Sequence, residues 1–525
     1  MAPLMQFIAT FFLFALPWLN PFAPGPSPAI VPLFFSWSCV GALIALRCRV
    51  FSPLPEKHGV SVVAWAWLAA GLLSSAMGLY QYFDSPISLI PWINQARLGE
   101  AFANLRQRNQ FASLTNIALV SLIWFAAVLT LKEKLNLSPI KRLQGLSMLA
   151  AVLLAFGNAA SSSRTGMLQL LLICGLCWTW GLWRQRLTRR VLLTAIIAYV
   201  VATLALPWLA GFDLFQQGMS ARLRAGDSLC SSRLTLWSNV LHLITQKPWL
   251  GWGWGELDYA HYITLYEGPR FCEILDNAHN LPLHLAVELG LPLSLAICGS
   301  FTYWVLQQKP WRELNLTRQL AWSVLAVILL HSLLEYPLWY GPFQIAFGLC
   351  LAMLWSTRAK LIDQPEPERK ASKPLSTSAY TALLATISIA CIAYAGWDYR
   401  RISQIYLSPE LRDAAYRSDT LNKIRSSWLF ATQVRFAELN ITPLTSDNAE
   451  WVFETATAML HYSPEPRVIE KVIESSLLLR RNGDALMHMA RYRAAFPVEY
   501  AQWERLLDKS HVSSRLVKSV SKPEN

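Results

Sequence analysis

The stretch Asn277–Pro292, NAHNLPLHLAVELGLP, changes character within a few residues. It starts as a polar turn containing Asn277, His279 and Asn280, and it continues as an apolar helix of the kind found in membranes. An imidazole with amide neighbours at the mouth of a membrane helix lies where a reaction in water can reach a lipid-borne substrate. We therefore expect the rest of the chain to be a helical scaffold that holds this turn at the membrane surface.

The overall composition is that of a membrane protein. Of the 525 residues, 54% are hydrophobic and only 15% are charged, whereas soluble proteins have about 25% charged residues. The mean hydropathy is positive. The net charge of +13 could suggest a nucleic-acid partner. The basic residues, however, lie in short clusters between apolar runs, so we expect them to set membrane orientation and expect no nucleic acid to bind.

Apolar runs predict eleven membrane spans, so the expected fold class is an all-α polytopic membrane protein. The first run resembles a signal peptide. It has neither a basic n-region nor a clear small-residue cleavage site, and we expect it to remain as an uncleaved span. The runs lie near residues 5–20, 29–46, 60–81, 110–131, 143–159, 166–183, 191–209, 284–306, 319–336, 341–356 and 378–397.

Basic residues follow every even-numbered span, and the gaps after the first and ninth spans contain none. The positive-inside rule then puts the N-terminus in the cytoplasm. With eleven spans, the C-terminus is expected outside. The five clusters are Arg47, Arg49 and Lys57; Lys132, Lys134, Lys141 and Arg142; Arg184, Arg186, Arg189 and Arg190; Lys309, Arg312 and Arg318; and Arg358, Lys360, Arg369, Lys370 and Lys373.

This topology divides the chain into four parts, which are residues 1–209 with seven spans, the outer loop 210–283, residues 284–397 with four spans, and the tail 398–525. The outer loop is long and rich in Trp, Tyr and Gly, so we expect it to be folded and functional. The tail is charged, with apolar residues at helical spacing. Breaks at Pro443, 463–466, 482–483 and Pro497 predict paired helices, similar to tetratricopeptide repeats, with a scaffolding or docking role.

The nine cysteines are too few and too scattered for a disulfide scaffold. Cys230 and Cys272 are the two cysteines of the outer loop, and an oxidising compartment would favour a disulfide between them. Cys174 and Cys177 lie inside an apolar run and are interpreted as packing residues. No metal-ligand motif is present, so we expect neither a metal nor a cofactor.

Two arginines are candidates for binding an anion. Arg164 lies in SSSRTG, a tight polar turn between two spans on the outer side, although a short loop can also contain an arginine that only reaches the membrane surface. Arg233 opens a predicted amphipathic helix, where a solvated charge is the alternative. The expected apolar face of that helix consists of Leu236, Trp237, Val240, Leu241 and Ile244.

Three further patterns could contribute to a site. The glycines of GWGWG permit a tight path, and Trp252 and Trp254 could lie at the membrane interface or stack on sugar rings. His284 and Glu288 are one helical turn apart and have a plausible structural role as a pair. His331 and Glu335 are also four residues apart, and they could relay protons or simply satisfy each other in the packing.

Five motifs, in this order, resemble the O-antigen ligase (Wzy_C) superfamily, and within it the PglL-type bacterial protein O-oligosaccharyltransferases that glycosylate pilins. The motifs are RNQFA at 108–112, SSSRTG at 161–166, SRLTLW…GWGWGE at 232–256, NAHN…ELGLP at 277–292 and HSLLEYPLWYGP at 331–342. The resemblance covers roughly residues 100–357, and the charged helical tail also fits this branch.

The resemblance implies a GT-C-like membrane glycosyltransferase of the bacterial inner membrane. Such an enzyme takes an oligosaccharide from undecaprenyl pyrophosphate on the periplasmic face, without nucleotide sugar or metal, and transfers it to a pilin-like protein. His279 matches the family's essential histidine, and Arg164 and Arg233 match its two loop arginines. The family is commonly drawn with twelve spans, one more than predicted here. Second-rank substrate-binding candidates are Asn277, Asn280, Glu288, Glu335, Tyr336, Arg108, Trp252 and Trp254.

The chemistry of these residue types agrees with the resemblance. Guanidinium groups make bidentate contacts to phosphate oxygens and stabilise charge that develops on a pyrophosphate leaving group. An imidazole can orient or deprotonate an acceptor hydroxyl near neutral pH. Ligation to lipid A core and polymerisation of O-antigen units are alternatives within the enzyme class. A transporter or flippase for lipid-linked glycan is the alternative from another class.

Overall fold

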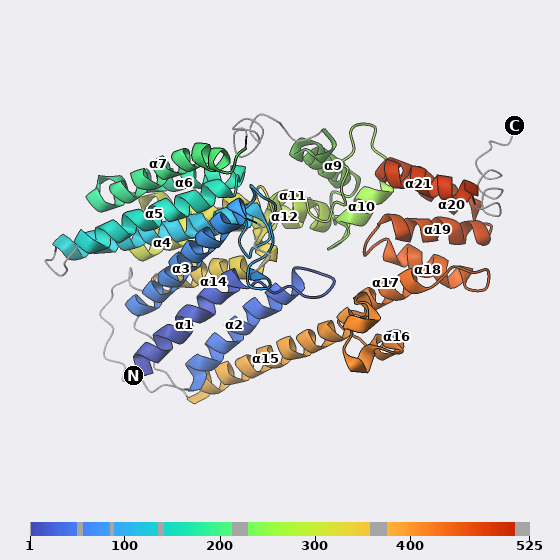
Figure 1. The fold of residues 1–525 in the computed structure, drawn as a ribbon, viewed down its shortest axis with the longest axis horizontal. Coiled ribbons are helices and arrows are strands. Elements are labelled where there is room, and N and C mark those ends of the chain that lie inside the picture. Colours follow the sequence, from blue (N-terminus) through green and yellow to red (C-terminus); the bar gives the residue numbers. More distant parts are fainter. Residues whose placement is uncertain are drawn as a thin grey trace. The chain divides into compact units, whose positions relative to one another are not determined.

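The computed structural model of the protein describes residues 2–49, 56–84, 89–134, 141–212, 229–357 and 375–509, and within these ranges it is all-helical, without β-strands (Figure 1). The chain forms two compact units. Unit 1 comprises Met1–Ala225 and Trp304–Gly396, and unit 2 comprises Gly226–Tyr303 and Trp397–Asn525. The predicted outer loop and the predicted tail therefore contribute to the same unit.

Unit 1 is a bundle of apolar helices, with α4 at its centre in contact with α3, α5, α6, α7 and α13. The bundle consists of α1 (Ala2–Leu19), α2 (Ile30–Arg49), α3 (Glu56–Phe83), α4 (Arg108–Lys134), α5 (Lys141–Ala160), α6 (Arg164–Thr179), α7 (Arg186–Leu209), α13 (Leu316–Ser332), α14 (Gly341–Ser356) and most of α15 (Leu375–Ser403).

Small residues allow the central helices to approach closely. A Cβ added at Gly71 of α3 would lie 2.3 Å from the Cβ of Ala118 in α4, and one added at Gly157 of α5 would lie 2.4 Å from Ser75 Oγ in α3. Helices in a membrane associate largely through such close packing, because lipid provides no hydrophobic force between them. On α6, Cys177 is buried and Cys174 is half-buried, and both are free thiols.

Five segments of the described residues are long and apolar enough to cross a membrane, as a polytopic membrane protein requires: Gly59–Phe83, Arg108–Leu131, Leu143–Ala160, Arg186–Leu209 and Ala382–Tyr406. Shorter apolar helices cover Leu4–Leu19, Ile30–Leu46, Arg164–Thr179, Leu316–Ser332 and Gly341–Ser356. With the exception of the eighth, each predicted span corresponds to one of these helices. Arg358, Lys360, Arg369, Lys370, Lys373 and residues 213–228 of the outer loop lie outside the described residues.

The prediction of one continuous span over residues 284–306 is wrong. The structure has two helices here, α11 (Leu281–Leu289) and α12 (Leu291–Gln308), and Gly290 between them has a φ of 84°. Leu285, Ala286 and Val287 of α11 are buried, whereas α12 exposes most of its apolar side chains. The nine-residue α11 is too short to cross a membrane. Its buried side chains belong to the core of unit 2, so it lies outside the spans, and the predicted eighth crossing is left to the 18-residue α12 alone.

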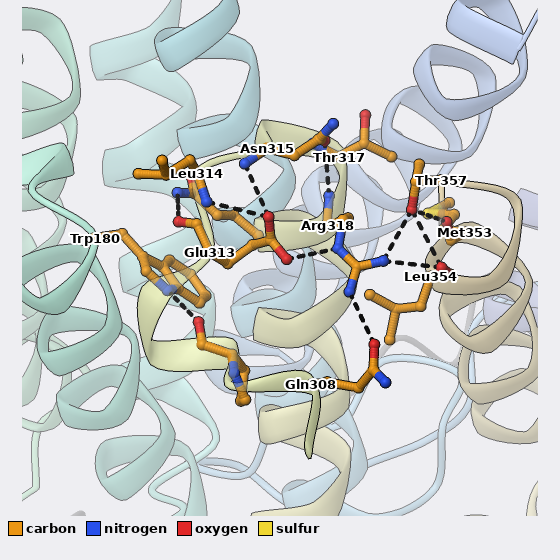
Figure 2. Close-up of polar contacts among 12 residues, drawn as sticks. Trp180, Gln308, Glu313, Leu314, Asn315, Thr317, Arg318, Met353, Leu354 and Thr357 are labelled. Carbon is orange, nitrogen blue, oxygen red and sulfur yellow. Dashed lines mark hydrogen bonds and ion pairs between the residues drawn. The ribbon is translucent and has the colours of Figure 1, made fainter. Parts of the chain in front are cut away.

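Arg318 was predicted as one of the basic loop residues after the eighth span, and this prediction is wrong because the residue is buried. Its side chain is 3% exposed at the start of α13, and its Nε donates to Glu313 Oε2 over 2.5 Å. Figure 2 shows the rest of its partners, which are the carbonyl of Leu354, Thr357 Oγ1 and Gln308 Oε1. A buried charge is stable only when it is paired and hydrogen-bonded. The bonds from Arg318 to Leu354 and Thr357 also hold the start of α13 against the end of α14.

Unit 2 contains the short helices of the outer loop and a series of tail helices, each packed against the next from α17 to α21. Two tail helices begin at prolines, where the missing N–H costs nothing, since the first turn has no partner for it. The loop helices are α9 (Arg233–Gln246), α10 (Leu257–Ile263), α11 and the first part of α12. The tail helices are α16 (Thr420–Ile424), α17 (Ala431–Ile441), α18 (Ala449–Met459), α19 (Pro466–Leu478), α20 (Asn482–Ala495) and α21 (Pro497–Lys509).

Candidate functional site

In unit 1, the turn before Arg164 is held by hydrogen bonds. Ser163 is the N-cap of α6, and its Oγ accepts from the backbone N–H of Gly166 over 3.0 Å. The same hydroxyl donates to Asn109 Oδ1 at the start of α4 over 2.6 Å. Arg164 is therefore the first residue of a 16-residue helix, where unpaired N–H groups and the helix dipole attract anions.

Glu335 is attached to the same region. Its carboxylate accepts from Gln107 Nε2 over 3.3 Å and from Asn109 Nδ2 over 3.2 Å. The helix α13 ends at Ser332, so Glu335 lies in the turn beyond it and not on a helix face with His331. Tyr336 follows and stacks on Tyr340, with ring centroids 6.0 Å apart. Arg108 does not share this contact, since its NH2 group pairs with Glu100.

Below this turn, a buried polar network crosses the apolar bundle. Ser113 Oγ lies 2.9 Å from His331 Nδ1 and accepts from Gln169 Nε2 over 2.7 Å. Asn116 Nδ2 donates to Gln169 Oε1 and to the carbonyl of Gly166 over 3.0 Å, and Asn158 Nδ2 donates to Asn116 Oδ1. This network was not predicted from the sequence. Its signal was present as amide side chains inside apolar runs, which are costly in lipid unless they are paired.

In unit 2, Arg233 has the same local setting as Arg164. Ser232 is the N-cap of α9, its Oγ accepts from Thr235 N over 3.1 Å, and Arg233 is the first helical residue. Cys230, two residues before this cap, forms a disulfide with Cys272, with Cα atoms 5.2 Å apart. Each of the two candidate arginines thus opens a helix directly after a capping serine.

The buried face of α9 differs in one position from the predicted one. Leu236, Val240 and Ile244 are buried as expected, and Trp237 packs partly against them. Leu241, however, is 52% exposed, while Leu243 is fully buried. The reason is tertiary, because the GWGWG segment runs along this side of α9 and Trp252 Nε1 donates to the carbonyl of Leu243 over 3.0 Å.

The segment 248–256, which contains GWGWG and which we call the strap, binds the end of α11 through backbone hydrogen bonds. Trp252 N donates to Val287 O over 2.8 Å, Gly253 N to Glu288 O over 3.0 Å, and Leu291 N to Pro248 O over 2.8 Å. A Cβ at Gly251 would lie 2.3 Å from Glu288 O, and one at Gly290 would lie 2.2 Å from Trp249 O. This crossing of two backbones is what interrupts the predicted eighth span.

The turn that contains His279 is fixed on both sides. Asn277 is buried and its Oδ1 accepts from the backbone N–H of His279 over 2.9 Å. The carbonyl of Ala278 accepts from Trp237 Nε1 over 3.1 Å. Asn280 is the N-cap of α11 and accepts from Leu283 N. His279 itself has a φ of 49°, a left-handed conformation that is uncommon for non-glycine residues as a whole but several-fold enriched for histidine.

His284 and Glu288 form a buried pair on α11, with His284 Nε2 and Glu288 Oε2 3.5 Å apart. Burial lowers the pKa of His284 to about 4 and raises the pKa of Glu288 to about 7. Burial thus favours the neutral form of each group. Trp254 lies beside this pair, with its ring centroid 6.0 Å from that of His284.

The tail packs onto the outer loop through α10, a contact that the sequence pattern did not predict. Tyr262 is buried in the core of the tail helices, and its hydroxyl lies 2.9 Å from His488 Nδ1. Tyr259 stacks on His461 with ring centroids 3.6 Å apart. His461 Nδ1 also lies 2.6 Å from Glu256 Oε2, at the end of the strap. The tail is therefore in direct contact with the GWGWGE motif.

The candidate residues fall into two groups. Arg164, Arg108, Glu335 and Tyr336 belong to unit 1, and the structure connects the first and third of them through Asn109 and Ser163. The remaining candidates belong to unit 2. There, α9, the strap, α11 and the His279 turn share one apolar core, built on Leu236, Val240, Leu257 and Val287.

Three family models match separate parts of the chain. The O-Antigen ligase model covers residues 149–298, which include Arg164, Arg233 and His279. The Protein glycosylation ligase model covers residues 101–126, which include Arg108. The model described as Virulence factor membrane-bound polymerase, C-terminal, covers residues 319–510, which include Glu335 and most of the tail.

Two curated proteins of Acinetobacter baylyi are similar to the chain. A General O-oligosaccharyltransferase is 26% identical over 314 residues, which are 58% of this chain and 52% of that protein. A ComP-specific O-oligosaccharyltransferase is 26% identical over 295 residues, which are 55% and 50% of the two chains. The chain thus matches about half the length of these relatives. No solved structure matches it significantly. The chain is accordingly similar to the O-antigen ligases and protein glycosylation ligases, which confirms the resemblance predicted from its five motifs.

Proposed function

We propose that the protein is an O-oligosaccharyltransferase that moves a glycan from undecaprenyl pyrophosphate to a Ser or Thr hydroxyl of a pilin-like protein. The observation that carries this proposal is the repeated setting of the two arginines. Arg164 and Arg233 each follow a serine N-cap and open a helix of at least 14 residues. Each arginine is therefore the first residue of a helix whose N-terminus already favours negative charge. A pyrophosphate would be stabilised both by the guanidinium group and by the helix N-terminus.

His279 is the proposed acceptor-activating group. The Asn277 side chain and the Trp237 indole both bind the peptide group that joins Ala278 to His279, so the imidazole extends from a turn with little freedom. A general base that is already held in position loses less conformational entropy when the reactive geometry forms. Asn277 and Asn280 have positioning roles in this proposal, since both side chains bind backbone N–H groups.

The reaction proposed is a single displacement. The acceptor hydroxyl oxygen forms a bond to the anomeric carbon, and its proton passes to His279. The bond from the anomeric carbon to the pyrophosphate oxygen breaks, and its electron pair stays on that oxygen. The growing negative charge is stabilised by the arginines, which in this proposal serve in place of a metal ion. Attack from the opposite side inverts the anomeric configuration.

The names of the relatives favour transfer to protein, because both are O-oligosaccharyltransferases. Polymerisation of glycan units is the second candidate, supported by the match of residues 319–510 to the membrane-bound polymerase model. The apolar helices support a membrane location. We propose the bacterial inner membrane, with the N-terminus in the cytoplasm and the outer loop and tail in the periplasm.

The decisive variant is His279→Ala, tested by intact mass of a pilin co-expressed with the full chain and a lipid-linked glycan pathway. We expect glycan transfer to fall by at least about 100-fold, the usual contribution of a general base, at unchanged membrane levels. His242→Ala is the matched control, since His242 is exposed on α9 and contacts Gln246. Normal transfer by His279→Ala would contradict the proposal, as would loss of transfer by the control.

Arg164→Lys and Arg233→Lys test the pyrophosphate contact in the same assay. Lysine keeps the charge but not the planar fork that binds two phosphate oxygens. We expect each variant to lose most of its transfer activity. Transfer at the wild-type level by both lysine variants would show that a point charge is enough and would remove the bidentate contact from the mechanism.

A further inference from the structure

Unit 1 contains a cavity of about 300 Å³ next to Tyr336. Its walls come from the end of α1, the start of α2, residues 104–110 before and within α4, and residues 336–342 around the start of α14. Cavities that bind small molecules begin at about this volume and combine apolar walls with a few placed polar groups. This cavity has that make-up, with Pro17, Pro32 and Leu33 beside Arg106, Gln110 and Tyr340.

Gln110 points to a ligand. It lines the cavity and is only 1% exposed, yet its Nε2 has no hydrogen-bond partner among the described residues. A buried donor without a partner destabilises a fold, and native structures contain few of them. A leucine at this position of an apolar helix would avoid that cost, whereas a ligand in the cavity with a hydrogen-bond acceptor would pair with the amide.

The other polar residues that line the cavity provide hydrogen-bond donors and aromatic rings. Arg106 is half-buried, has a φ of 60°, and donates from NH2 to the carbonyl of Pro21 over 2.5 Å. The rings of Tyr336 and Tyr340 are stacked in its wall. No Asp or Glu is among the described residues that line the cavity. The cavity therefore offers one cation, amide donors and aromatic faces, and no negative charge.

The cavity is also connected to the turn of Arg164. Gln107 lines the cavity and donates to Glu335. Glu335 accepts from Asn109, and Asn109 accepts from Ser163, the residue that caps the helix of Arg164. A ligand that displaced Gln107 would thus act on the turn proposed to hold the pyrophosphate.

We propose that this cavity is a saccharide subsite, in which Gln110 and Arg106 donate to ring hydroxyls and the tyrosines pack against the C–H face of a pyranose. The inference rests on the proposed function, since the glycan of the donor would supply the saccharide. An acyl chain would leave Gln110 unpaired, and a phosphate would have only one cationic partner. A sugar uses both the donors and the rings.

The test is saturation-transfer NMR on the full-length protein in detergent, with N-acetylglucosamine, galactose and glucuronic acid as separate probes, and with inorganic phosphate and farnesol as comparison arms. We expect at least one sugar to receive saturation from the wild type. Gln110→Leu should weaken that binding by at least about tenfold, one hydrogen bond's worth of affinity. It should also keep or raise the melting temperature, because the unpaired amide is gone. Gln6→Leu, the same change at a buried glutamine near the other end of α1, should leave binding unchanged.

Absence of sugar binding to the wild type would overturn the inference. So would sugar binding that Gln110→Leu leaves intact, or Gln110-dependent binding of phosphate or farnesol in place of a sugar. The assay contains no lipid donor and no acceptor, so it is independent of transfer. Gln110-independent sugar binding with a transfer-dead His279→Ala would remove this inference alone. Gln110-dependent binding by a protein that transfers nothing would remove the proposed function alone.

Discussion

At the residue scale, Gly251 and Gly290 allow the strap to lie directly on the end of α11. Both have positive φ, and at both a Cβ would meet backbone atoms of the other segment at 2.2–2.3 Å. Backbone atoms cannot move aside as the end of a flexible side chain can. These two glycines are therefore required by the crossing itself, and the position of the strap beside His284 and Glu288 depends on them.

Gly251→Ala should destabilise the protein more than Gly255→Ala. Both glycines have positive φ, at 70° and 79°, but a Cβ at Gly255 meets nothing within 4 Å. Each change costs about 1–2 kcal/mol for the left-handed backbone, and Gly251→Ala adds roughly 1–3 kcal/mol of overpacking. Melting temperatures of the full chain by intrinsic fluorescence measure the difference. Equal shifts for the two variants would mean that the strap does not contact α11 as described.

The opposite pKa shifts of His284 and Glu288 predict two pH dependences of stability that oppose each other in the wild type. Glu288, with its pKa raised to about 7, contributes stability that is present below its ordinary pKa of 4.5 and is lost as pH rises to about 7. His284, with its pKa lowered to about 4, contributes stability that is present above its ordinary pKa of 6.5 and is lost as pH falls to about 4. In the wild type the two slopes oppose each other between about pH 4.5 and 6.5.

Replacing one member of the pair should reveal how the other member alone makes stability depend on pH. In Glu288→Gln, only His284 remains, and the melting temperature should fall as pH is lowered from about 6.5 towards 4. In His284→Gln, only Glu288 remains, and the melting temperature should fall as pH is raised from about 4.5 to 7. Melting curves over this range, relative to wild type, check the signs. Parallel pH profiles for both variants would show that the pair is not buried as a neutral couple.

At the scale of elements, α10 links the outer loop to the tail. Its Tyr262 is 2% exposed and packs with Val452, Val468 and Tyr492 of the tail. An isolated seven-residue helix has no stability of its own in water, so α10 depends on the tail for its order. The strap ends next to α10, at Glu256, and is held there by His461. The tail in this way stabilises the end of the strap that it touches.

Tyr262→Ala should loosen the tail from the outer loop. Removing a large buried aromatic side chain costs about 3–5 kcal/mol, and the tail helices should become sensitive to a protease added at low concentration. Tyr303→Ala is the control, because Tyr303 of α12 is 65% exposed. Gel analysis of the digested full chain compares the two. Equal resistance of Tyr262→Ala and wild type would contradict a tail held through α10.

At the scale of the whole molecule, the functional proposal depends on which side of the membrane each segment faces. The His279 turn, Arg164 and Arg233 must all face the periplasm for the donor and acceptor to meet there. The positive-inside rule predicts this arrangement from the basic clusters. Arg318 no longer counts as a loop charge, since it is buried with Glu313, but Lys309 and Arg312 keep the same gap basic.

Alkaline phosphatase, which is active only outside the cytoplasm, can be fused after selected residues of the chain to test this orientation. A fusion after Asn315 should be inactive, because residues 309–315 are predicted to be cytoplasmic. A fusion after Lys509 should be active, because the tail is predicted to be periplasmic. Fluorescent-protein fusions at the same positions should give the opposite pattern. An active fusion at Asn315 together with an inactive one at Lys509 would invert the topology and place the candidate histidine on the wrong side for a lipid-linked donor.

The sequence by itself determined the apolar helices and most of their positions, because a membrane helix needs a long uncharged run that is visible in one segment. It also placed Arg164 in a turn just before a span and Arg233 at the start of a helix, since helix starts are set by a few neighbouring residues. The five motifs were enough to predict the resemblance to the O-antigen ligases and protein glycosylation ligases, whose models match residues 149–298 and 101–126.

Only the tertiary structure decided how distant segments meet. The eighth span is broken because the strap crosses it at Gly290. Arg318 is buried because Glu313, Leu354 and Thr357 surround it. The tail joins the loop through Tyr262 and His488, which are 226 residues apart in the chain. Local periodicity indicates whether a segment can be a helix. It contains no information about which remote backbone or side chain will lie against that helix. Packing between such remote partners sets the geometry of the site.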